Sequence, residues 1–181
     1  MIKNEYTEKN IAEKIRAGDQ CAFEKMFLSY YSKLCVFSNS HVKSLDAARD
    51  VVQEVFIKIW DSHEEFEIRQ SLKAYLYQAV RNQSLNYIEK NKQKRRLNNS
   101  LRKHEDLLKE ENPANLNTEE LTQKIWKLVD ELPERRRSIF ILYRKHGLSY
   151  KEIAEVMGIK RKTVENQMGK SLIFLRERLD L

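Results

Sequence analysis

Cationic and amide side chains gather between residues 160 and 170, where their types suit the binding of an anion. Lys160, Arg161 and Lys162 stand together at the expected start of a helix. A helix N-terminus already carries partial positive charge from unpaired N–H groups, so three cations there are locally unfavourable unless something anionic meets them. The two interpretations are a solvated turn and a helix end that binds phosphate.

The helix that precedes this cluster follows from its cap residues. Ser149 and Glu152 match the S-x-x-E capping box, which predicts a helix that starts at Tyr150 and stops at Gly158. The residues expected to be buried on it are Ile153, Ala154 and Met157, and those expected to be exposed are Lys151 and Glu155. The chain therefore reaches the cationic cluster through a tight turn.

A second helix then buries apolar residues spaced i, i+4, i+8 and i+11. These are Val164, Met168, Leu172 and Leu175. Small Ala154 permits a close helix crossing, and Gly158 supplies a left-handed turn. Together these features predict a helix-turn-helix. The alternative is a helical hairpin with an ordinary polar surface.

The opposite face of this second helix carries groups that can read DNA. They are Lys162, Asn166 and Gly169, flanked by Thr163 and Lys170, and Arg161 joins them at the helix start. Asn can pair with an adenine edge, Thr can meet a thymine methyl group or a phosphate, and Lys can reach guanine or the backbone. A glycine lets another backbone come close. We interpret this face as one that enters the major groove of duplex DNA.

Another helix is predicted just upstream, starting at Leu132-Pro133-Glu134 with the proline in its first turn. Its expected buried residues are Ile139, Phe140, Leu142 and Tyr143. The first turn also holds Arg135, Arg136 and Arg137. Three interpretations stay open for these arginines: a clamp on the DNA backbone, a contact with an acidic protein surface, or a solvated cluster.

The composition indicates an all-α protein made of two small helical domains. Only 4 Gly and 2 Pro occur among 181 residues, of which 41% are hydrophobic and 34% charged. The formal net charge of +7 lies entirely beyond residue 91, which favours a polyanionic partner for that part over a solvated basic surface. Neither an apolar run long enough to cross a bilayer nor a signal peptide is visible, so we expect a cytoplasmic protein.

The order of patterns divides the chain into a domain at 1–92, a linker at 93–117 and a domain at 118–181. The linker is dominated by Lys, Arg, Asn, Glu and Gln and holds Pro113, so it is predicted to be a tether, and transient helix within it is left open. In the first domain we expect four helices. The first lies at about 7–17, the second starts after its N-cap Asp19, the third lies at about 46–60 and the fourth at about 71–92.

The helix at 46–60 has an unusual exposed face. Its predicted buried stripe is Val52, Val55, Phe56 and Ile59, and the opposite side carries Asp50, Glu54, Ile57 and Asp61, with Gln53 and Trp60 at the borders. An isoleucine among acids suggests a protein interface. A scattered surface apolar residue is equally compatible with the spacing.

The helix at 71–92 has apolar residues on one side and a polar line on another. The apolar side is Leu72, Leu76, Ala79 and Val80, and the line is Tyr75, Ala79, Asn82 and Asn86, with Arg81 and Lys90 beside it. Amides and one aromatic ring can hold a nucleic-acid strand. An ordinary exposed face is the alternative.

The residues that could support catalysis are scattered. Cys21, Cys35 and His41 form no nucleophile–base–acid set, and neither a C-x-x-C pair nor a phosphate-binding loop is present. We therefore expect reduced thiols, no metal, no cofactor and no enzymatic activity, with a thiol enzyme as a remote alternative.

Three stretches resemble one family. The string "LPERRRSIFILYRKHGLSYKEIAEVMGIKRKTVENQMGKSLIFLRERL" at 132–179 is similar to the promoter-reading domain of extracytoplasmic-function (ECF) sigma factors. The strings "DAARDVVQEVFIKIW" at 46–60 and "SLKAYLYQAVRNQSLNYI" at 71–88 resemble region 2 of the same family. The piece "TVENQMGKSL" resembles a subgroup common in Bacteroidetes bacteria.

The resemblance implies a function and a role for each surface. The chain would bind core RNA polymerase and direct promoter-specific initiation. The residues implied to bind the polymerase clamp helices are Asp50, Gln53, Glu54, Ile57, Trp60 and Asp61. Those implied to hold the melted −10 strand and its flipped base are Phe66, Glu67, Ile68, Arg69, Tyr75, Arg81, Asn82, Asn86 and Lys90. Those implied to read the −35 duplex are Arg161, Lys162, Thr163, Asn166, Gly169 and Lys170.

The implied partners are core RNA polymerase, promoter DNA as duplex and as melted strand, and an anti-sigma factor, which in this family is often bound to a membrane. No small-molecule substrate is implied. Lys160 departs from the family pattern, which often has a small hydroxyl residue there to cap the recognition helix, so the promoter preference stays open. The alternative is a helix-turn-helix regulator that dimerises on DNA without being a polymerase subunit.

Overall fold

The computed structural model describes residues 8–68, 71–97 and 118–179, and side chains within 10–68, 71–92 and 122–179. These residues form eight α-helices and one 3-10 helix, and the described ranges hold no strand. The predicted all-α fold class is confirmed. No helix among the described residues is both long and apolar enough to cross a membrane.

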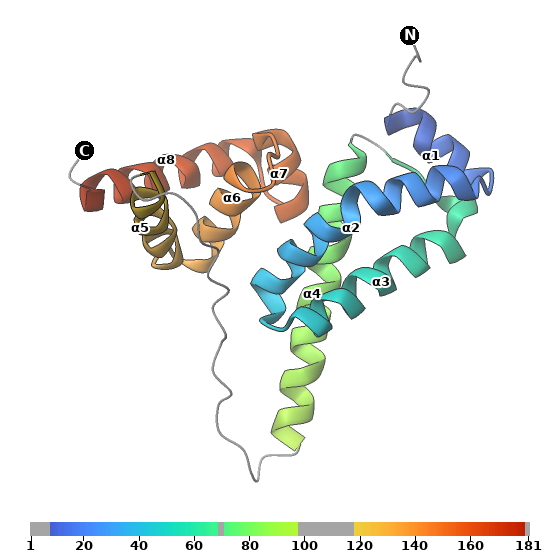
Figure 1. Cartoon of the computed structure of the whole chain (residues 1–181), viewed down its shortest axis with the longest axis horizontal. Helices are drawn as coiled ribbons and strands as arrows, with labels where there is room; N and C mark the ends of the chain where they lie inside the picture. The colour runs from blue at the N-terminus through green and yellow to red at the C-terminus, as the bar shows by residue number, and fades with distance from the viewer. Residues whose placement is uncertain (1–7, 69–70, 98–117, 180–181) are drawn as a thin grey trace. The chain divides into compact units, whose positions relative to one another are not determined.

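The chain divides into two compact units, and each is described by itself. The first contains α1 (Glu8–Arg16), α2 (Gln20–Val42), α3 (Leu45–Asp61), η1 (His63–Glu65) and α4 (Leu72–Leu97) (Figure 1). The second contains α5 (Thr118–Asp130), α6 (Glu134–Arg144), α7 (Tyr150–Met157) and α8 (Arg161–Leu179).

The core of the first unit lies among α2, α3 and α4, which all pack against one another. The predicted stripe of Val52, Val55, Phe56 and Ile59 is buried on α3. The α2 residues Met26, Leu34 and Phe37 and the α4 residues Leu72, Leu76, Tyr77 and Val80 complete this core. The buried Ser38 and Ser84 hydroxyls satisfy each other at 3.0 Å between α2 and α4.

The ends of α2 and α3 are fixed by short polar caps. Asp19 Oδ1 accepts the Ala22 N–H at 3.0 Å and starts α2, as predicted. Lys43 ends α2 in the left-handed region, at a φ of 60°. Ser44 then accepts the Ala47 N–H and starts α3. The chain thereby reverses direction between two long helices within a two-residue turn.

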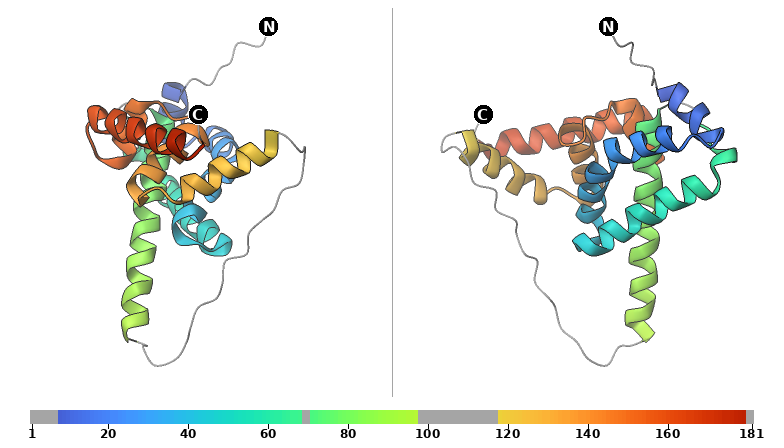
Figure 2. Two further views of the ribbon diagram at one scale, coloured as in Figure 1. Left: turned by 90° about the vertical axis from the view of Figure 1, so that its left-hand side faces the viewer. Right: turned by 45° about the vertical axis from the view of Figure 1, so that its right-hand side comes forward.

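The helix α4 is longer than the predicted 71–92. It runs without interruption from Leu72 to Leu97 and extends past the helices against which it packs (Figure 2). The sequence holds no Gly or Pro in this range, and its Lys, Arg, Gln and Leu residues are good helix formers. The predicted linker therefore begins as helix at 93–97, and its remaining residues, 98–117, lie outside the described ones.

The second unit packs α5, α6 and α7 against α8 or one another. Ile139, Phe140 and Leu142 are buried as predicted, but Tyr143 is 39% exposed. Its ring lies against that of Tyr150, with the centroids 5.1 Å apart, and the Arg144 guanidinium lies 5.9 Å from its centroid. Pro133 is the N-cap of α6 rather than a first-turn residue.

The predicted capping box starts α7. The Glu152 N–H donates to Ser149 Oγ at 3.3 Å, and the Ser149 N–H donates to Glu152 Oε2 at 2.8 Å. Gly158 ends the helix with a φ of 62°. Ile153 is buried as predicted, whereas Ala154 and Met157 are half-buried and Val156 takes the second core position.

The register of α8 differs from the prediction at one position. Val164, Met168 and Leu175 are buried, but Leu172 is 47% exposed and Ser171 is buried instead. At about 100° per residue, Ser171 lies roughly 20° from Val164 around the helix, and Leu172 about 80°. The Ser171 hydroxyl donates to the Gln167 carbonyl at 2.9 Å, which makes its burial tolerable.

Candidate nucleic-acid and partner interfaces

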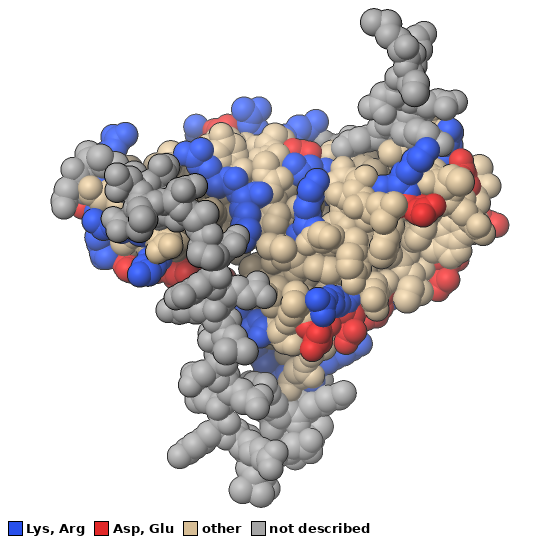
Figure 3. Space-filling model, in the orientation of Figure 1, with Lys and Arg blue, Asp and Glu red and all other residues tan. Residues whose placement is uncertain are grey.

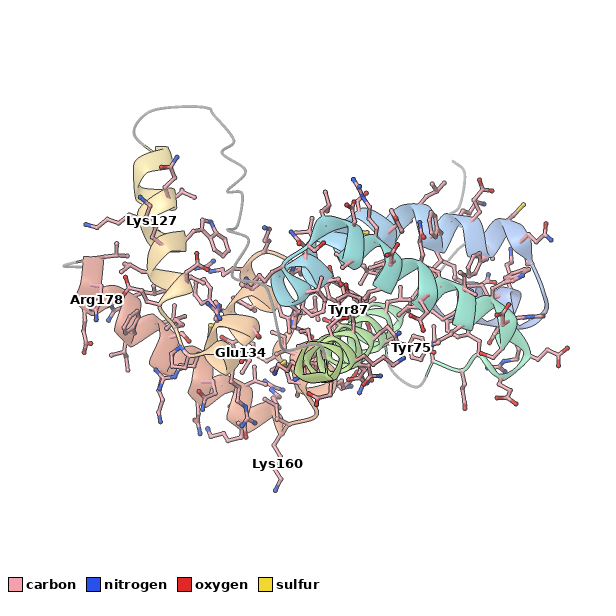
Figure 4. All side chains as sticks on the ribbon, turned by 90° about the horizontal axis from the view of Figure 1, so that it is seen from below. Tyr75, Tyr87, Lys127, Glu134, Lys160 and Arg178 are labelled. Carbon is pink, nitrogen blue, oxygen red and sulfur yellow. The ribbon has the colours of Figure 1, made fainter. Side chains whose placement is uncertain are left out.

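The start of α8 carries the three cations without a side-chain cap from Lys160. The Lys160 carbonyl accepts the N–H groups of Thr163 and Val164 at 2.8 and 3.3 Å. An ammonium has no acceptor, so the Lys160 side chain cannot bond the free N–H groups of the first turn. It extends away from the ribbon instead (Figure 4).

The six α8 residues predicted to read duplex DNA are free of the core. Arg161, Lys162, Asn166, Gly169 and Lys170 are exposed, and Thr163 is half-buried. Lys and Arg side chains are frequent over the second unit, and acidic ones are few, on the face drawn in Figure 3. Cations and an amide thus share one accessible helix surface, as a groove-reading helix requires.

An acidic residue that the sequence analysis missed lies within this basic face. Glu165 Oε1 accepts from Arg161 Nε at 3.0 Å, and its Oε2 lies 3.6 Å from Lys162 Nζ. The signal was present in the i, i+4 and i, i+3 spacing of these charges. Glu165 therefore balances part of the positive charge that gathers at the helix start.

Gly169 has no structural reason to be glycine. It lies inside α8, and a Cβ added to it would have no heavy atom within 4 Å among its described neighbours. A glycine inside a helix costs about 0.5–1 kcal/mol relative to alanine. The open space lies outside the protein, on the side where DNA is expected.

The α3 surface is acidic and apolar, as predicted. Asp50, Gln53, Glu54 and Asp61 are exposed, and Ile57 is 58% exposed. Glu54 Oε1 lies 2.8 Å from Lys58 Nζ, and this hydrogen bond holds the pKa of Glu54 below its ordinary value. Glu54 is therefore ionised near neutral pH and paired with Lys58, and the exposed Ile57 lies between Glu54 and Asp61 along the helix.

Trp60 is fixed at the border of this surface by aromatic neighbours. Its ring lies 4.9 Å from that of Phe23 and stacks on His63 at 5.2 Å, measured between centroids. Trp60 is half-buried, so only part of its side chain is available to a partner. This differs from Ile57, which projects without such support.

The residues predicted to hold a melted strand occupy different environments. Phe66 is only 4% exposed, and its ring meets Tyr75 edge-on at 5.3 Å. A base contact through Phe66 would require its ring to leave this packing position. Burial of Tyr75 raises the pKa of its phenol, so this ring is neutral and partly covered.

The remaining residues of this set lie at the surface or outside the described residues. Glu67, Asn82, Asn86 and Lys90 are exposed, and Ile68 and Arg81 are half-buried. Arg69 lies outside the described residues. Asn82, Asn86 and Lys90 recur every four residues along α4, so they form one polar side of that helix.

A link between α1 and the segment after η1 was also missed. The Arg16 guanidinium donates from Nε and Nη2 to the Phe66 carbonyl, at 3.1 and 3.0 Å. These atoms are 50 positions apart in the chain, and no local spacing signals such a pair. Arg16 therefore fixes the point where the segment leaves η1.

The thiols and His41 are not brought together. Cys21 is exposed near the start of α2, whereas Cys35 is buried, and that burial raises the pKa of its thiol. His41 Nδ1 lies 3.1 Å from the Phe37 carbonyl in its own helix. Within the described residues, no three His, Cys, Asp or Glu side chains are grouped as for a metal ion.

Comparison with known proteins assigns a class to each unit. Residues 26–94 match the family model described as Sigma-70 region 2, and residues 122–175 match Sigma-70, region 4. A chain that carries both regions in this order, with a helix-turn-helix in the second, has the organisation of a sigma-70 type initiation factor.

Full-length relatives narrow the class. The chain is 30% identical to the ECF RNA polymerase sigma-E factor of Escherichia coli (strain K12) over 192 residues, covering 99% of this chain and 95% of that protein. Identity to the sigma-E factor of Haemophilus influenzae is 29% over 182 residues, covering 92% of each. The chain belongs to the ECF sigma factor family.

Two solved structures share the fold. CnrH in complex with the cytosolic domain of CnrY matches with a TM-score of 0.66 and 20% identity, covering 96% of this chain and 97% of that one. The sigma factor RpoE of Bartonella quintana, in complex with the anti-sigma factor NepR, matches with a TM-score of 0.67 and 23% identity, covering 88% and 97%.

Family membership decides between the alternatives of the sequence analysis. Sigma factors are transcription initiation factors and not enzymes, so the function of this chain is promoter-directed initiation. The two alternatives, a dimeric helix-turn-helix regulator and a thiol enzyme, are not supported.

Proposed function

We propose that this sigma factor divides its work between surfaces on its two units. The α3 surface of Asp50, Gln53, Glu54, Ile57, Trp60 and Asp61 docks on core RNA polymerase. The exposed face of α8 reads the −35 duplex, and α4 with the segment 66–69 holds the melted −10 strand. The corresponding domains are 1–92 and 118–181, with 93–117 between them.

One observation carries this proposal: the exposed faces of α3 and α8 have opposite chemistry. On α3, Glu54 and Asp61 flank the 58% exposed Ile57 at i−3 and i+4. On α8, Lys162 and Lys170 flank Asn166 at i−4 and i+4. An acidic and apolar face suits a protein helix rich in arginine. A cationic face with an amide suits phosphates and base edges.

The −10 surface is proposed with a division of labour that its burial suggests. Asn82, Asn86 and Lys90 are exposed and can bind the strand directly. Phe66 is buried and would support the segment, while Glu67 and Ile68 are more accessible. Each base taken out of the stack needs compensating contacts worth about 1–3 kcal/mol.

Three finer assignments belong to the same proposal. The motif "TVENQMGKSL" supports membership of the Bacteroidetes-type subgroup. The solved relatives CnrH and RpoE are in complex with CnrY and with NepR, an anti-sigma factor, which supports an anti-sigma partner for this chain. Action on core RNA polymerase and promoter DNA would place the chain in the cytoplasm.

Run-off transcription with purified core polymerase on genomic fragments tests the division of labour. Asp50→Ala or Gln53→Ala should impair assembly with core, and therefore transcription, on every template. Lys162→Ala or Asn166→Ala should mainly reduce discrimination between templates with different upstream elements. Each DNA-reading variant should cost about 1–3 kcal/mol where a base contact is lost.

Matched controls are available in both units. Glu24→Ala removes an exposed acid from α2, and Arg176→Ala removes an exposed cation about 21 Å along α8 from Lys162. Both controls should transcribe like the unchanged protein. Equal loss on every template for the α3 and α8 variants would contradict the proposed division.

A further inference from the structure

Glu165 stands out because it is an acid in the middle of a surface proposed to bind a polyanion. Its carboxylate is divided between two cations: Oε1 accepts from Arg161 Nε at 3.0 Å, and Oε2 lies 3.6 Å from Lys162 Nζ. The Glu165 side chain is 32% exposed, against 68% and 80% for its partners. The acid therefore lies deeper than the two cations.

The arrangement has little value for the fold. Exposed ion pairs at i, i+3 or i, i+4 contribute little to stability, because water screens them and two long side chains must be ordered. An acid near a helix N-terminus interacts favourably with the helix dipole only within the first turn. Glu165 follows that turn, so another role for it must be sought in binding.

Phosphate and Glu165 compete for the same two cations. A DNA phosphate that approaches Arg161 or Lys162 either displaces the carboxylate or shares the cation with it, and in both cases the two like charges lie close together. Sequences that also offer base contacts to Asn166 or Lys162 compensate for this exchange. Sequences that offer only phosphates do not.

We propose that Glu165 is an internal counterion that positions Arg161 and Lys162 and weakens sequence-independent attraction of α8 for DNA. The inference rests on the proposed role of α8 in duplex binding. Its consequence is selectivity, because a basic face would otherwise bind any duplex through its phosphates. Glu165 is thus a positioning residue that acts through the two cations.

The test is binding of the full chain to a fluorescent duplex of about 24 base pairs of random sequence, followed by anisotropy from about 50 to 200 mM salt. Glu165→Gln should bind about 3- to 10-fold more tightly at equal salt. The plot of log affinity against log salt should steepen by about one unit, since one more phosphate is neutralised. A purely structural role would leave this slope unchanged.

Glu177→Gln is the matched control. It makes the same change in net charge on the exposed surface of the same helix, but about 18 Å along the axis from Glu165. That distance exceeds the Debye length of about 8–10 Å at 0.1–0.15 M salt. We expect its affinity to stay within about twofold of the unchanged chain and its slope to stay the same.

Glu165→Asp keeps the negative charge and should bind with an affinity near that of the unchanged chain. This variant shows whether an effect of Glu165→Gln comes from the lost charge or from a folding defect. Equal affinity and slope for Glu165→Gln and Glu177→Gln would overturn the inference. Lys162→Ala distinguishes failure of the counterion role of Glu165 from failure of the proposed DNA binding by α8. If Lys162→Ala weakens binding while Glu165→Gln changes nothing, only the counterion role fails. If neither changes binding, the role of α8 in DNA binding fails as well.

Discussion

Gly169 shows how one residue can be selected by a partner rather than by the fold. Nothing described within the protein occupies the space that a Cβ would fill, and the residue lies in the interior of α8. We expect Gly169→Ala to stabilise the second unit by about 0.5–1 kcal/mol, because alanine restricts the unfolded chain and favours helix. Thermal unfolding measures this gain.

The same substitution should weaken duplex binding, because the added methyl group keeps the DNA backbone or groove wall away from α8. Two quantities are measured for the variant and the unchanged protein: the affinity of the holoenzyme for a promoter fragment and the melting temperature of the free chain. Opposite signs for stability and affinity are the expected signature. A variant that is more stable and binds equally well would show that Gly169 faces no ligand.

Arg16 is a residue whose role depends on distance in the chain. Its guanidinium donates two hydrogen bonds to the Phe66 carbonyl, and charged donors of this kind contribute about 1.5–3 kcal/mol. Solvent exposure of Arg16 lowers that figure, so we expect Arg16→Ala to destabilise the first unit by about 1 kcal/mol. Chemical denaturation checks the value.

Arg49→Ala serves as the comparison for Arg16→Ala. Arg49 is an exposed arginine of the same unit whose ion pair with Asp46 lies at i, i+3, and its loss should cost less than about 0.5 kcal/mol. Hydrogen exchange at Phe66 and Glu67 should rise for Arg16→Ala alone. Equal effects of both substitutions would mean that the link to the Phe66 carbonyl adds nothing.

The start of α8 is an element whose cap is incomplete in a defined way. Lys160 supplies a carbonyl to the first turn but no side-chain acceptor. We expect Lys160→Ser to stabilise the second unit by about 0.5–1 kcal/mol, because a hydroxyl at the N-cap accepts a free N–H of the first turn. Lys160→Ala removes the same cation without adding an acceptor and should give no such gain in melting temperature.

Both Lys160 variants lose one positive charge, so both should bind duplex DNA with a shallower salt dependence. The Ser and Ala variants should therefore agree in salt slope and differ in stability. If the two melt at the same temperature, the hydroxyl does not cap the helix, and the start of α8 is already satisfied by water.

Helices that begin at a local cap could be predicted from the sequence. Their contacts with residues far away in the chain could not. The capping box at Ser149 and the N-cap Asp19 are satisfied by neighbours within three residues, so their chemistry is legible in the chain. The buried position on α8 was assigned to Leu172 because leucine is apolar, although geometry favours Ser171. A prediction based on hydropathy selects Leu172, whereas the angular position on the helix determines that Ser171 is buried.

The candidate site divides in the same way. Exposure of the α3 acids and α8 cations followed from period and charge, and both faces lie where the pattern predicts. The burial of Phe66 did not follow, because it depends on Tyr75 and on Arg16 from another helix. A segment between helices has no period, so its burial is set by tertiary contacts that the sequence does not display.

At the scale of the whole molecule, two units carry sites of different chemistry on one chain. The first unit presents acids and an exposed isoleucine, and the second presents the cations of α8. Neither site needs to be strong, because a protein that binds polymerase and promoter together gains from linkage.

The connection between the units therefore sets the strength of promoter binding through effective concentration. Two modules joined by a short chain see each other at millimolar levels, which can raise apparent affinity by about 10²–10⁴ without a new contact. We predict that a protease site placed within 98–117 leaves transcription intact until it is cleaved. After cleavage, run-off product at nanomolar factor should fall by about 10²-fold or more.

Raising both fragments to micromolar concentrations should restore part of the product, because mass action replaces the lost linkage. That recovery distinguishes loss of linkage from loss of folding, which concentration would not repair. Circular dichroism before and after cleavage should show unchanged helix content. If the cleaved protein initiates like the intact chain at nanomolar concentration, one unit alone holds the promoter complex, and linkage between two weak sites is not the source of its affinity.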